Sequence, residues 1–387
     1  MDFQEKIESI APYTEEESME AIRKLANNPE VFFISKYLFP DEPIDYMRRK
    51  LRKVQSSEEF QSVMMNESVE WIIKNTTCGF SYDGVENLKS FDGKFLMMSN
   101  HRDIVLDPAF TQYLLNANKI PLTEIAVGDN LLSSKSVEYL LRCNRMIKVI
   151  RGISARELYL SSQMLSRYIR DSVSSGKSSV WIAQRQGRTK NGIDITEQGL
   201  LKMIDLSGTK SFVDNFKELN IVPLSISYEF EPCDVRKARE IYISSRRKYV
   251  KKKNEDLHSI LMGMRQQKGH VHLHVGGRLT NGELEAAALC ANKNDRYQWI
   301  RNVVDRRVIQ GYRLWPTNYI AYDLIHGTAK YNDRYAGADV EHFKAYMEHR
   351  LDKVEKALDR DELRNIFLGI YAGPVESKEK LYRDIAE

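Results

Sequence analysis

The chain has 387 residues, of which 42% are hydrophobic and 29% are charged. This length and composition are ordinary for a globular protein with a large core. The net charge of +4 is too small to indicate a nucleic-acid partner. No run approaches the roughly 18 apolar residues that span a bilayer, so we expect any membrane contact to be made from one side.

The cysteines and the N-terminus indicate the compartment. Cys78, Cys143, Cys233 and Cys290 are widely spaced and form no Cys-x-x-Cys pair. They predict reduced thiols rather than a disulfide framework or a zinc site. The first six residues lack the basic and then apolar order of a signal peptide. We therefore expect a cytoplasmic protein.

The hydrophobic pattern divides the chain into three parts. Residues 1–90 are predicted to be helical, and residues 281–387 contain long, charged helical segments. Between them, in 91–280, short apolar runs alternate with helical patterns, which is typical of an α/β domain with helices packed on a sheet. The apolar runs that predict strands are 94–98, 122–127, 146–150, 179–183 and 221–227.

The loop over 100–108, directly after the first predicted strand, contains His101, Arg102, Asp103 and Asp107. A histidine held by a carboxylate can remove a proton from a hydroxyl. Asp107 also fits the N-cap of the next helix, because a proline follows it at the first helical position. Both roles are compatible, since a helix N-terminus favours an ionised carboxylate. A hydrogen-bonded loop histidine without a chemical role is the alternative.

Two further loops carry cations at the ends of predicted strands. Arg151 ends the strand over 146–150, and Ser154 with Glu157 forms a capping box that opens the next helix. A cation that faces a helix N-terminus is suited to phosphate, although a solvated arginine fits this pattern equally well.

The second of these loops, 184–192, combines Gly187 with Arg185, Arg188 and Lys190. Glycine lets the backbone approach a ligand, and arginine binds phosphate with two hydrogen bonds. A flexible basic turn is the alternative. The next apolar run, 221–227, has a proline near its start and predicts a core strand.

Together these four blocks resemble the glycerolipid acyltransferase family, which includes glycerol-3-phosphate and 1-acylglycerol-3-phosphate acyltransferases. The resemblance covers about residues 94–232 and follows the family's His-(four residues)-Asp, Phe-Ile-Arg-Arg, Glu-Gly-x-Arg and Val-Pro blocks. The matching segments are, in chain order, His101 with Asp107, Lys148–Arg151, Gly187–Gly192 and Val222–Ile226.

The chain departs from the family pattern at two positions. Five residues separate His101 from Asp107, where the family has four, and Asp103 is too close to His101 for the usual spacing. We expect Asp107 to be the partner, with one extra residue bulged in the loop. The family's glutamate is absent, and Gln186 or Arg185 takes its place. The role of this position, and with it the acceptor's identity, is open.

The resemblance implies a mixed central sheet flanked by helices, as in glycerol-3-phosphate acyltransferase, with helical additions at both ends. It implies that His101 is the general base and Asp107 its orienting partner. The residues implied to bind substrate are Arg102, Lys148, Arg151, Gly187, Arg188 and Lys190. If the chain is an enzyme, His101 and Arg151 should share one pocket.

The implied reaction moves a fatty acyl group from acyl-carrier-protein or coenzyme A to glycerol 3-phosphate or 1-acylglycerol 3-phosphate in phospholipid synthesis. It involves no metal and no resident cofactor, because the thioester is a co-substrate. We expect peripheral contact with the anionic inner face of the cell membrane. The basic run 246–253 is suited to such a surface, and docking on an acidic acyl carrier protein and a solvated helix face are the alternatives. An acyltransferase for another polar lipid head, or a catalytically disabled lipid-binding protein on the same fold, remains as an alternative.

Overall fold

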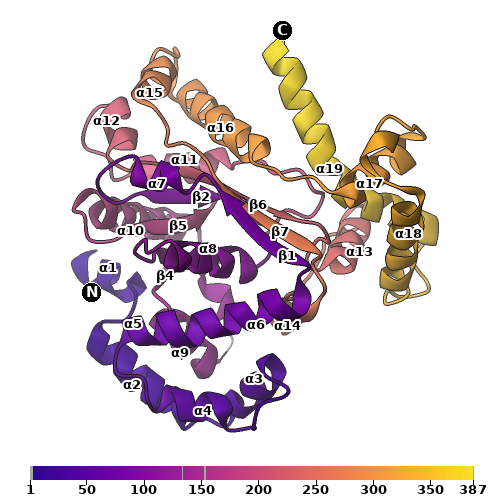
Figure 1. Cartoon of the computed structure of the whole chain (residues 1–387). Helices are drawn as coiled ribbons and strands as arrows, with labels where there is room; N and C mark the ends of the chain where they lie inside the picture. The colour runs from indigo at the N-terminus through magenta and orange to yellow at the C-terminus, as the bar shows by residue number, and fades with distance from the viewer. Residues whose placement is uncertain (1–2, 133, 152–153, 387) are drawn as a thin grey trace.

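The computed structural model describes residues 3–132, 134–151 and 154–386 (Figure 1). Its centre is a seven-stranded sheet with the strand order β1-β7-β6-β2-β5-β3-β4. Neighbouring strands run parallel, except that β6 and β7 are antiparallel. Helices flank the sheet. The predicted fold class, an α/β protein with a mixed central sheet, is therefore confirmed.

Five strands lie at the predicted apolar runs. These strands are buried within the sheet, and a buried strand has a short, nearly continuous hydrophobic sequence. They are β2 (Leu96–Ser99), β3 (Glu124–Gly128), β4 (Met146–Val149), β5 (Val180–Ala183) and β6 (Val222–Tyr228). β7 (His270–Val275) pairs with β6. β1 (Gly79–Asp83) lies within the 1–90 segment that the sequence predicts to be helical. It is an edge strand with largely exposed side chains, so it has no apolar run that would reveal it.

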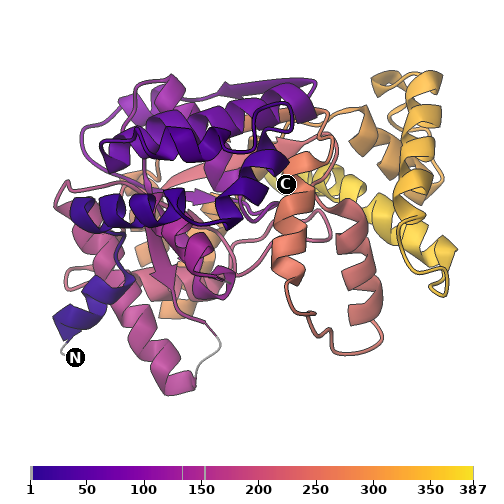
Figure 2. The same ribbon diagram turned by 90° about the horizontal axis from the view of Figure 1, so that it is seen from below.

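The first part of the chain is otherwise helical, and these helices gather along one side of the molecule (Figure 2). Part of this layer packs against the later helix α9 through a small apolar cluster that includes Ile22, Leu51 and Phe60. The elements are α1 (Phe3–Ile10), α2 (Glu15–Ala26), α3 (Glu30–Leu38), α4 (Tyr46–Leu51), α5 (Ser57–Glu59), the π-helix η1 (Phe60–Met65), α6 (Asn66–Thr76) and α7 (Glu86–Lys89).

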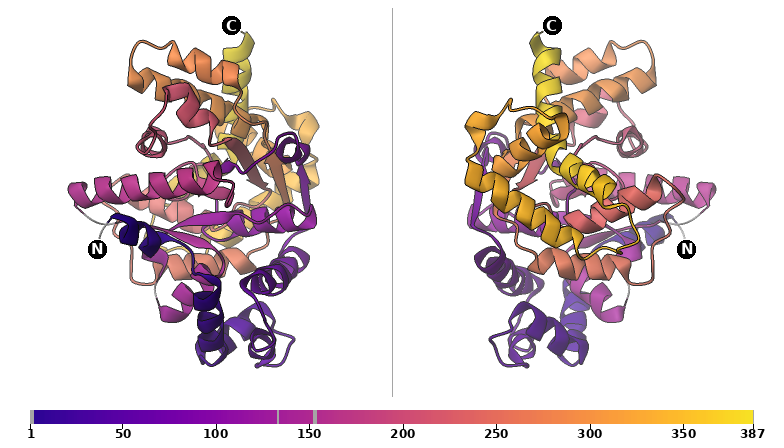
Figure 3. Two further views of the ribbon diagram at one scale, coloured as in Figure 1. Left: turned by 90° about the vertical axis from the view of Figure 1, so that its left-hand side faces the viewer. Right: turned by 90° about the vertical axis from the view of Figure 1, so that its right-hand side faces the viewer.

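The last part of the chain is also helical. α17, α18 and α19 lie together in Figure 3 and share an apolar cluster with α13 that includes Phe343, Phe367 and Tyr371. The elements after β6 are α13 (Asp234–Ser244), α14 (Glu255–Arg265), α15 (Asn281–Ala288), α16 (Lys293–Gln310), α17 (Pro316–His326), the 3-10 helix η3 (Asn332–Arg334), α18 (Gly337–Leu351) and α19 (Arg360–Ala386). Within the described segments, no helix has the length and apolar character needed to cross a bilayer.

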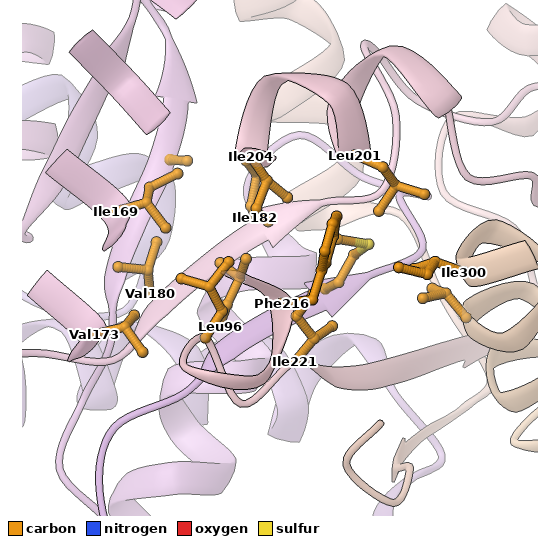
Figure 4. Packing of buried hydrophobic residues seen from close by; sticks show 14 of the residues in the cluster. Leu96, Ile169, Val173, Val180, Ile182, Leu201, Ile204, Phe216, Ile221 and Ile300 are labelled. Carbon is orange, nitrogen blue, oxygen red and sulfur yellow. The ribbon is translucent and has the colours of Figure 1, made fainter. Parts of the chain in front are cut away.

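Successive side chains of a strand point to opposite faces of the sheet, so the apolar core forms two layers, one on each face. Leu96 and Ile182 face the layer that contains Leu201 and Ile300, as Figure 4 shows. Met97 faces the opposite layer. The helices between the strands are α8 (Leu106–Ala117), the 3-10 helix η2 (Asp129–Leu131), α9 (Lys135–Cys143), α10 (Ala155–Ser174), α11 (Gln198–Asp205) and α12 (Phe212–Lys217). α10 opens with the predicted capping box of Ser154 and Glu157.

Candidate active site

The loop that contains His101 leaves β2 at the carboxyl end of the parallel strands, where α/β sheets form ligand sites. Two neighbouring segments fix its path. The buried Asn100 side chain exchanges hydrogen bonds with the backbone of Ile226 in β6, at 2.7 and 3.0 Å. The Thr189 N–H, from the loop after β5, donates to the His101 carbonyl at 2.7 Å. Two of the sequence blocks are thus joined directly at the histidine.

His101 Nδ1 lies 3.0 Å from Oδ2 of Asp107, which is fully buried. The same oxygen accepts the backbone N–H groups of Arg102 and Asp103, at 2.6 and 2.8 Å. Oδ1 accepts the hydroxyl of Tyr228 at 2.8 Å. A carboxylate with these donors acts as an acceptor, so His101 carries its proton on Nδ1 and leaves Nε2 free to accept another.

Asp103 caps α8 in place of Asp107. Its Oδ1 accepts the N–H groups of Val105 and Leu106, at 3.0 and 2.9 Å. The helix begins at Leu106, and Asp107 turns its side chain back toward the histidine loop. The interpretation of Asp107 as the N-cap is therefore wrong. A Cβ at Gly263 of α14 would lie 2.4 Å from the other oxygen of Asp103, so the helix and this carboxylate are closely packed.

A cavity of about 110 Å³ opens beside His101. Of the residues implied to bind substrate, Arg151, Gly187, Arg188 and Lys190 line it. The structure therefore brings His101 and Arg151 into one pocket. Further groups on its wall are Trp181 and Arg185, from β5 and the loop after it, and Glu240, Lys251 and Asp256, from α13, the α13–α14 connection and α14.

Three arginines of this pocket have no carboxylate within 4 Å among the described residues: Arg151, Arg185 and Arg188. Arg185 Nε and Arg188 Nη1 are buried without a hydrogen-bond partner. Burial lowers the pKa of Arg151, which packs against Gly128 so closely that a Cβ there would lie 2.8 Å from Nε. Unpaired, partly buried guanidinium groups favour the binding of an anion.

The two lysines on the pocket wall are already paired. Lys190 bonds Glu240, and Lys251 lies 2.7 Å from Asp256. The glutamine at the position of the family's glutamate, Gln186, is exposed, and its backbone N–H donates to Glu197 at 3.0 Å.

Arg102 does not line this pocket. It is buried, and its guanidinium donates to Asp194 at 2.8 Å and to the Gly192 carbonyl at 3.1 Å, with Glu231 at 3.5 Å. Burial alone would raise the pKa of Asp194, but Arg102 holds it below its ordinary value. The structure thus places Arg102 in a buried ion pair, which explains why it does not reach the site.

Lys148 also lies outside the cavity. It is half-buried on β4, near Glu138 of α9, whose pKa it helps to lower. Tyr228 and Asp194 also belong to this region, but neither lies in a sequence pattern that would indicate it. Tyr228 ends β6, and only the adjacency of β6 and β2 reveals its contact with Asp107. That adjacency cannot be read from the order of strands along the chain.

Comparisons with known proteins leave the family open. No protein-family model matches the chain, and no curated protein matches it in sequence. Among solved structures, the chain is similar to the 1-acyl-sn-glycerophosphate (LPA) acyltransferase PlsC from Thermotoga maritima. The TM-score is 0.38 and the identity 14%, over 76% of this chain and 94% of that chain. This degree of likeness assigns neither a family nor a function.

Proposed function

We propose that the chain transfers a fatty acyl group from an acyl-carrier-protein or coenzyme A thioester to a hydroxyl of glycerol 3-phosphate or 1-acylglycerol 3-phosphate. One observation carries this proposal. Nε2 of a carboxylate-held histidine shares a pocket with three arginines that form no ion pair within 4 Å among the described residues. A general base beside an anion site is what acylation of a phosphate-bearing alcohol requires.

In the proposed reaction, His101 Nε2 takes the proton of the acceptor hydroxyl while the hydroxyl oxygen attacks the thioester carbonyl. Asp107 keeps the proton on Nδ1 and stabilises the imidazolium that forms, with its own charge held by Tyr228 and two backbone N–H groups. The tetrahedral intermediate then collapses, the C–S bond breaks, and the leaving thiolate takes the proton back from His101. No resident metal or cofactor takes part.

The three arginines of the pocket would position the acceptor by binding its phosphate. Arg151, Arg185 and Arg188 would hold the phosphate, because all three line the pocket, and Arg185 Nε and Arg188 Nη1 are buried there without a hydrogen-bond partner in the described part of the chain. Gly187 has a φ of +74° and open space at its Cβ position, so the backbone there leaves room for a ligand. The cavity of about 110 Å³ is small. Since pockets that enclose drug-sized ligands measure roughly 300–1,000 Å³, it suits a head group, with the acyl chains outside.

The test is acyl transfer by purified protein. Labelled acyl-carrier-protein and acyl-coenzyme A thioesters are each offered with glycerol 3-phosphate, 1-acylglycerol 3-phosphate or an aminolipid with a free hydroxyl. We expect transfer to a phosphate-bearing acceptor, and a loss of about 10²–10⁴-fold in kcat in His101→Ala. His326→Ala, which changes an exposed histidine on α17, is the matched control.

Three outcomes would contradict the proposal. Transfer to the aminolipid alone would mean that the acceptor is a different polar head. Folded protein that binds lipid, yet transfers to no acceptor from either thioester, would identify the chain as a lipid-binding protein without catalytic activity. Equal activity of His101→Ala and the wild-type protein would exclude His101 as the base.

A further inference from the structure

Two exposed elements are joined along the chain to residues that line the pocket. One is the N-terminal end of α10, which follows Arg151 closely along the chain, and the other is the connection between α13 and α14, 245–254. Both project toward the same side of the molecule in Figure 2, and the left view of Figure 3 agrees. Lys251 of the connection lines the pocket, and Asp256 of α14 accepts a hydrogen bond from Asn130 after β3 at 3.2 Å. The α13–α14 connection thus borders the pocket, and the end of α10 lies on the same side of the molecule.

The first turns of α10 expose three consecutive apolar side chains, directly after the exposed Arg156 and Glu157. Leu158, Tyr159 and Leu160 are 50%, 53% and 40% exposed. Successive residues of a helix point about 100° apart, so three in a row cover much of its circumference. A flat protein partner would cover one stripe of such a helix. A helix end that is apolar on several sides favours a medium that surrounds it, such as the interface of a bilayer.

The α13–α14 connection adds positive charge beside this apolar end. Arg246 pairs with Glu362, and Lys251 pairs with Asp256. The other four cations of the run are exposed and have no carboxylate within 4 Å in the described part of the chain; they are Arg247, Lys248, Lys252 and Lys253. Val250, between them, is 75% exposed. Unpaired cations around an exposed apolar side chain match an anionic lipid surface in charge and polarity.

We propose that the end of α10 and the α13–α14 connection dock together on an anionic bilayer, with the pocket entrance facing the lipid. The inference builds on the proposed function, because it names the source of the acceptor. A phosphate head group in the membrane would reach the arginines while its acyl chain stays in the bilayer. An acidic carrier protein would use the cations but has no need of the exposed Leu158, Tyr159 and Leu160.

The test is flotation of the full chain with vesicles, which needs no turnover. One set of vesicles is phosphatidylcholine alone, and the other contains phosphatidylglycerol at about one third. A cation variant replaces Arg247, Lys248, Lys252 and Lys253 with Ser, and an apolar variant replaces Leu158, Tyr159 and Leu160 with Ser. The matched control replaces four exposed lysines on other elements with Ser: Lys74, Lys202, Lys217 and Lys353.

We expect the wild-type protein and the control to float with anionic vesicles only. Each cation near such a surface contributes about fivefold to partitioning, so the cation variant should bind at least ~20-fold more weakly. The apolar variant should also bind more weakly, and His101→Ala should bind as the wild type does. The last result separates docking from catalysis, because docking would persist even if the proposed reaction were absent.

Three results would overturn the inference. They are equal flotation of all variants, equal loss in the control, and no flotation of the wild-type protein. Normal flotation of the cation variant, combined with lost transfer from acyl-carrier-protein but not from coenzyme A, would assign the connection to carrier binding instead.

Discussion

Tyr228 and His101 bind opposite oxygens of one buried carboxylate. The Tyr228 hydroxyl donates to Oδ1 of Asp107 at 2.8 Å, and His101 Nδ1 lies 3.0 Å from Oδ2. Tyr228 ends β6 and Asp107 lies in the first turn of α8, so the contact joins the sheet to the helix that carries the carboxylate. Tyr228 thus positions Asp107 without touching the cavity.

Removing the Tyr228 hydroxyl should affect both stability and turnover. Tyr228→Phe leaves a buried carboxylate oxygen without its donor, which should lower the free energy of unfolding by about 1–3 kcal/mol. We expect kcat to fall by about tenfold at unchanged KM, since a less firmly held Asp107 orients His101 less well. Urea unfolding and steady-state kinetics measure both effects, with Tyr82→Phe on the exposed edge strand as the control. A destabilised variant with normal kcat would make Tyr228 purely structural.

Replacing Arg102 should act on folding alone. Its partner Asp194 is fully buried and would be left with an uncompensated charge, so Arg102→Ala should lower the free energy of unfolding by about 3–5 kcal/mol. At a temperature where the variant is folded, KM for the acceptor should match that of the wild type. A raised KM at unchanged stability would instead return Arg102 to the substrate, as the resemblance implies.

The unpaired arginines should control acceptor binding. Arg151→Ala and Arg188→Ala should each raise KM for the phosphate-bearing acceptor by about 10–100-fold, because each removes a charge-assisted hydrogen bond. Lysine at either position should restore only part of the affinity, since it lacks the two-pronged geometry. Steady-state kinetics checks this, with Arg23→Ala on the exposed face of α2 for comparison. KM values within twofold of the wild type would place the phosphate elsewhere.

A buried lysine should give the fold a distinctive pH dependence. Burial lowers the pKa of Lys268 from 10.5 to about 8, although its ammonium donates to Thr76, Gln266 and Met264. Below pH 8 both states carry the charge. Between about 8 and 10.5 the folded state loses the proton and the unfolded state keeps it, so the unfolded state binds more protons and stability rises with pH.

The Lys268→Met variant has no amine to titrate at this position. Comparing it with the wild-type protein therefore isolates the contribution of Lys268 to the pH dependence of stability. Between about pH 8 and 10.5, the free energy of unfolding of the wild-type protein should rise by up to about 3 kcal/mol relative to that of the variant. Urea unfolding at pH 7, 8, 9 and 10 measures the difference. Parallel pH profiles of the two proteins would show that Lys268 titrates normally in the fold.

Sequence patterns predicted the parts of the fold that bury apolar runs. The strands β2 to β6 are of this kind, and so is the capping box of Ser154, because both signals are local. The edge strand β1 was missed, since exposed polar residues form it and only pairing with β7 defines it. For the site, His101, Arg151 and Arg188 each follow a predicted strand, and all three line one pocket in the structure.

The buried ion pair of Arg102 could not be predicted from local sequence patterns. An arginine next to a candidate catalytic histidine has the same local sequence whether it faces a ligand or a buried carboxylate. The difference is set by Asp194, which lies 92 positions away along the chain and is brought close by the fold. The N-cap of α8 was wrongly assigned to Asp107 for a related reason, because the helix starts one residue before Asp107, and the position of a cap shifts with such small changes.

Gly263 of α14 packs closely against Asp103, in the loop that carries His101. α14 has 11 residues, so it is a rigid rod of about 16 Å that runs from the basic connection to the carboxylate capping α8. A side chain at position 263 would force Asp103 to move, and the other oxygen of Asp103 accepts the N–H groups of Val105 and Leu106 at the start of α8. The absence of a side chain at Gly263 therefore lets α14 lie directly against the loop that carries His101.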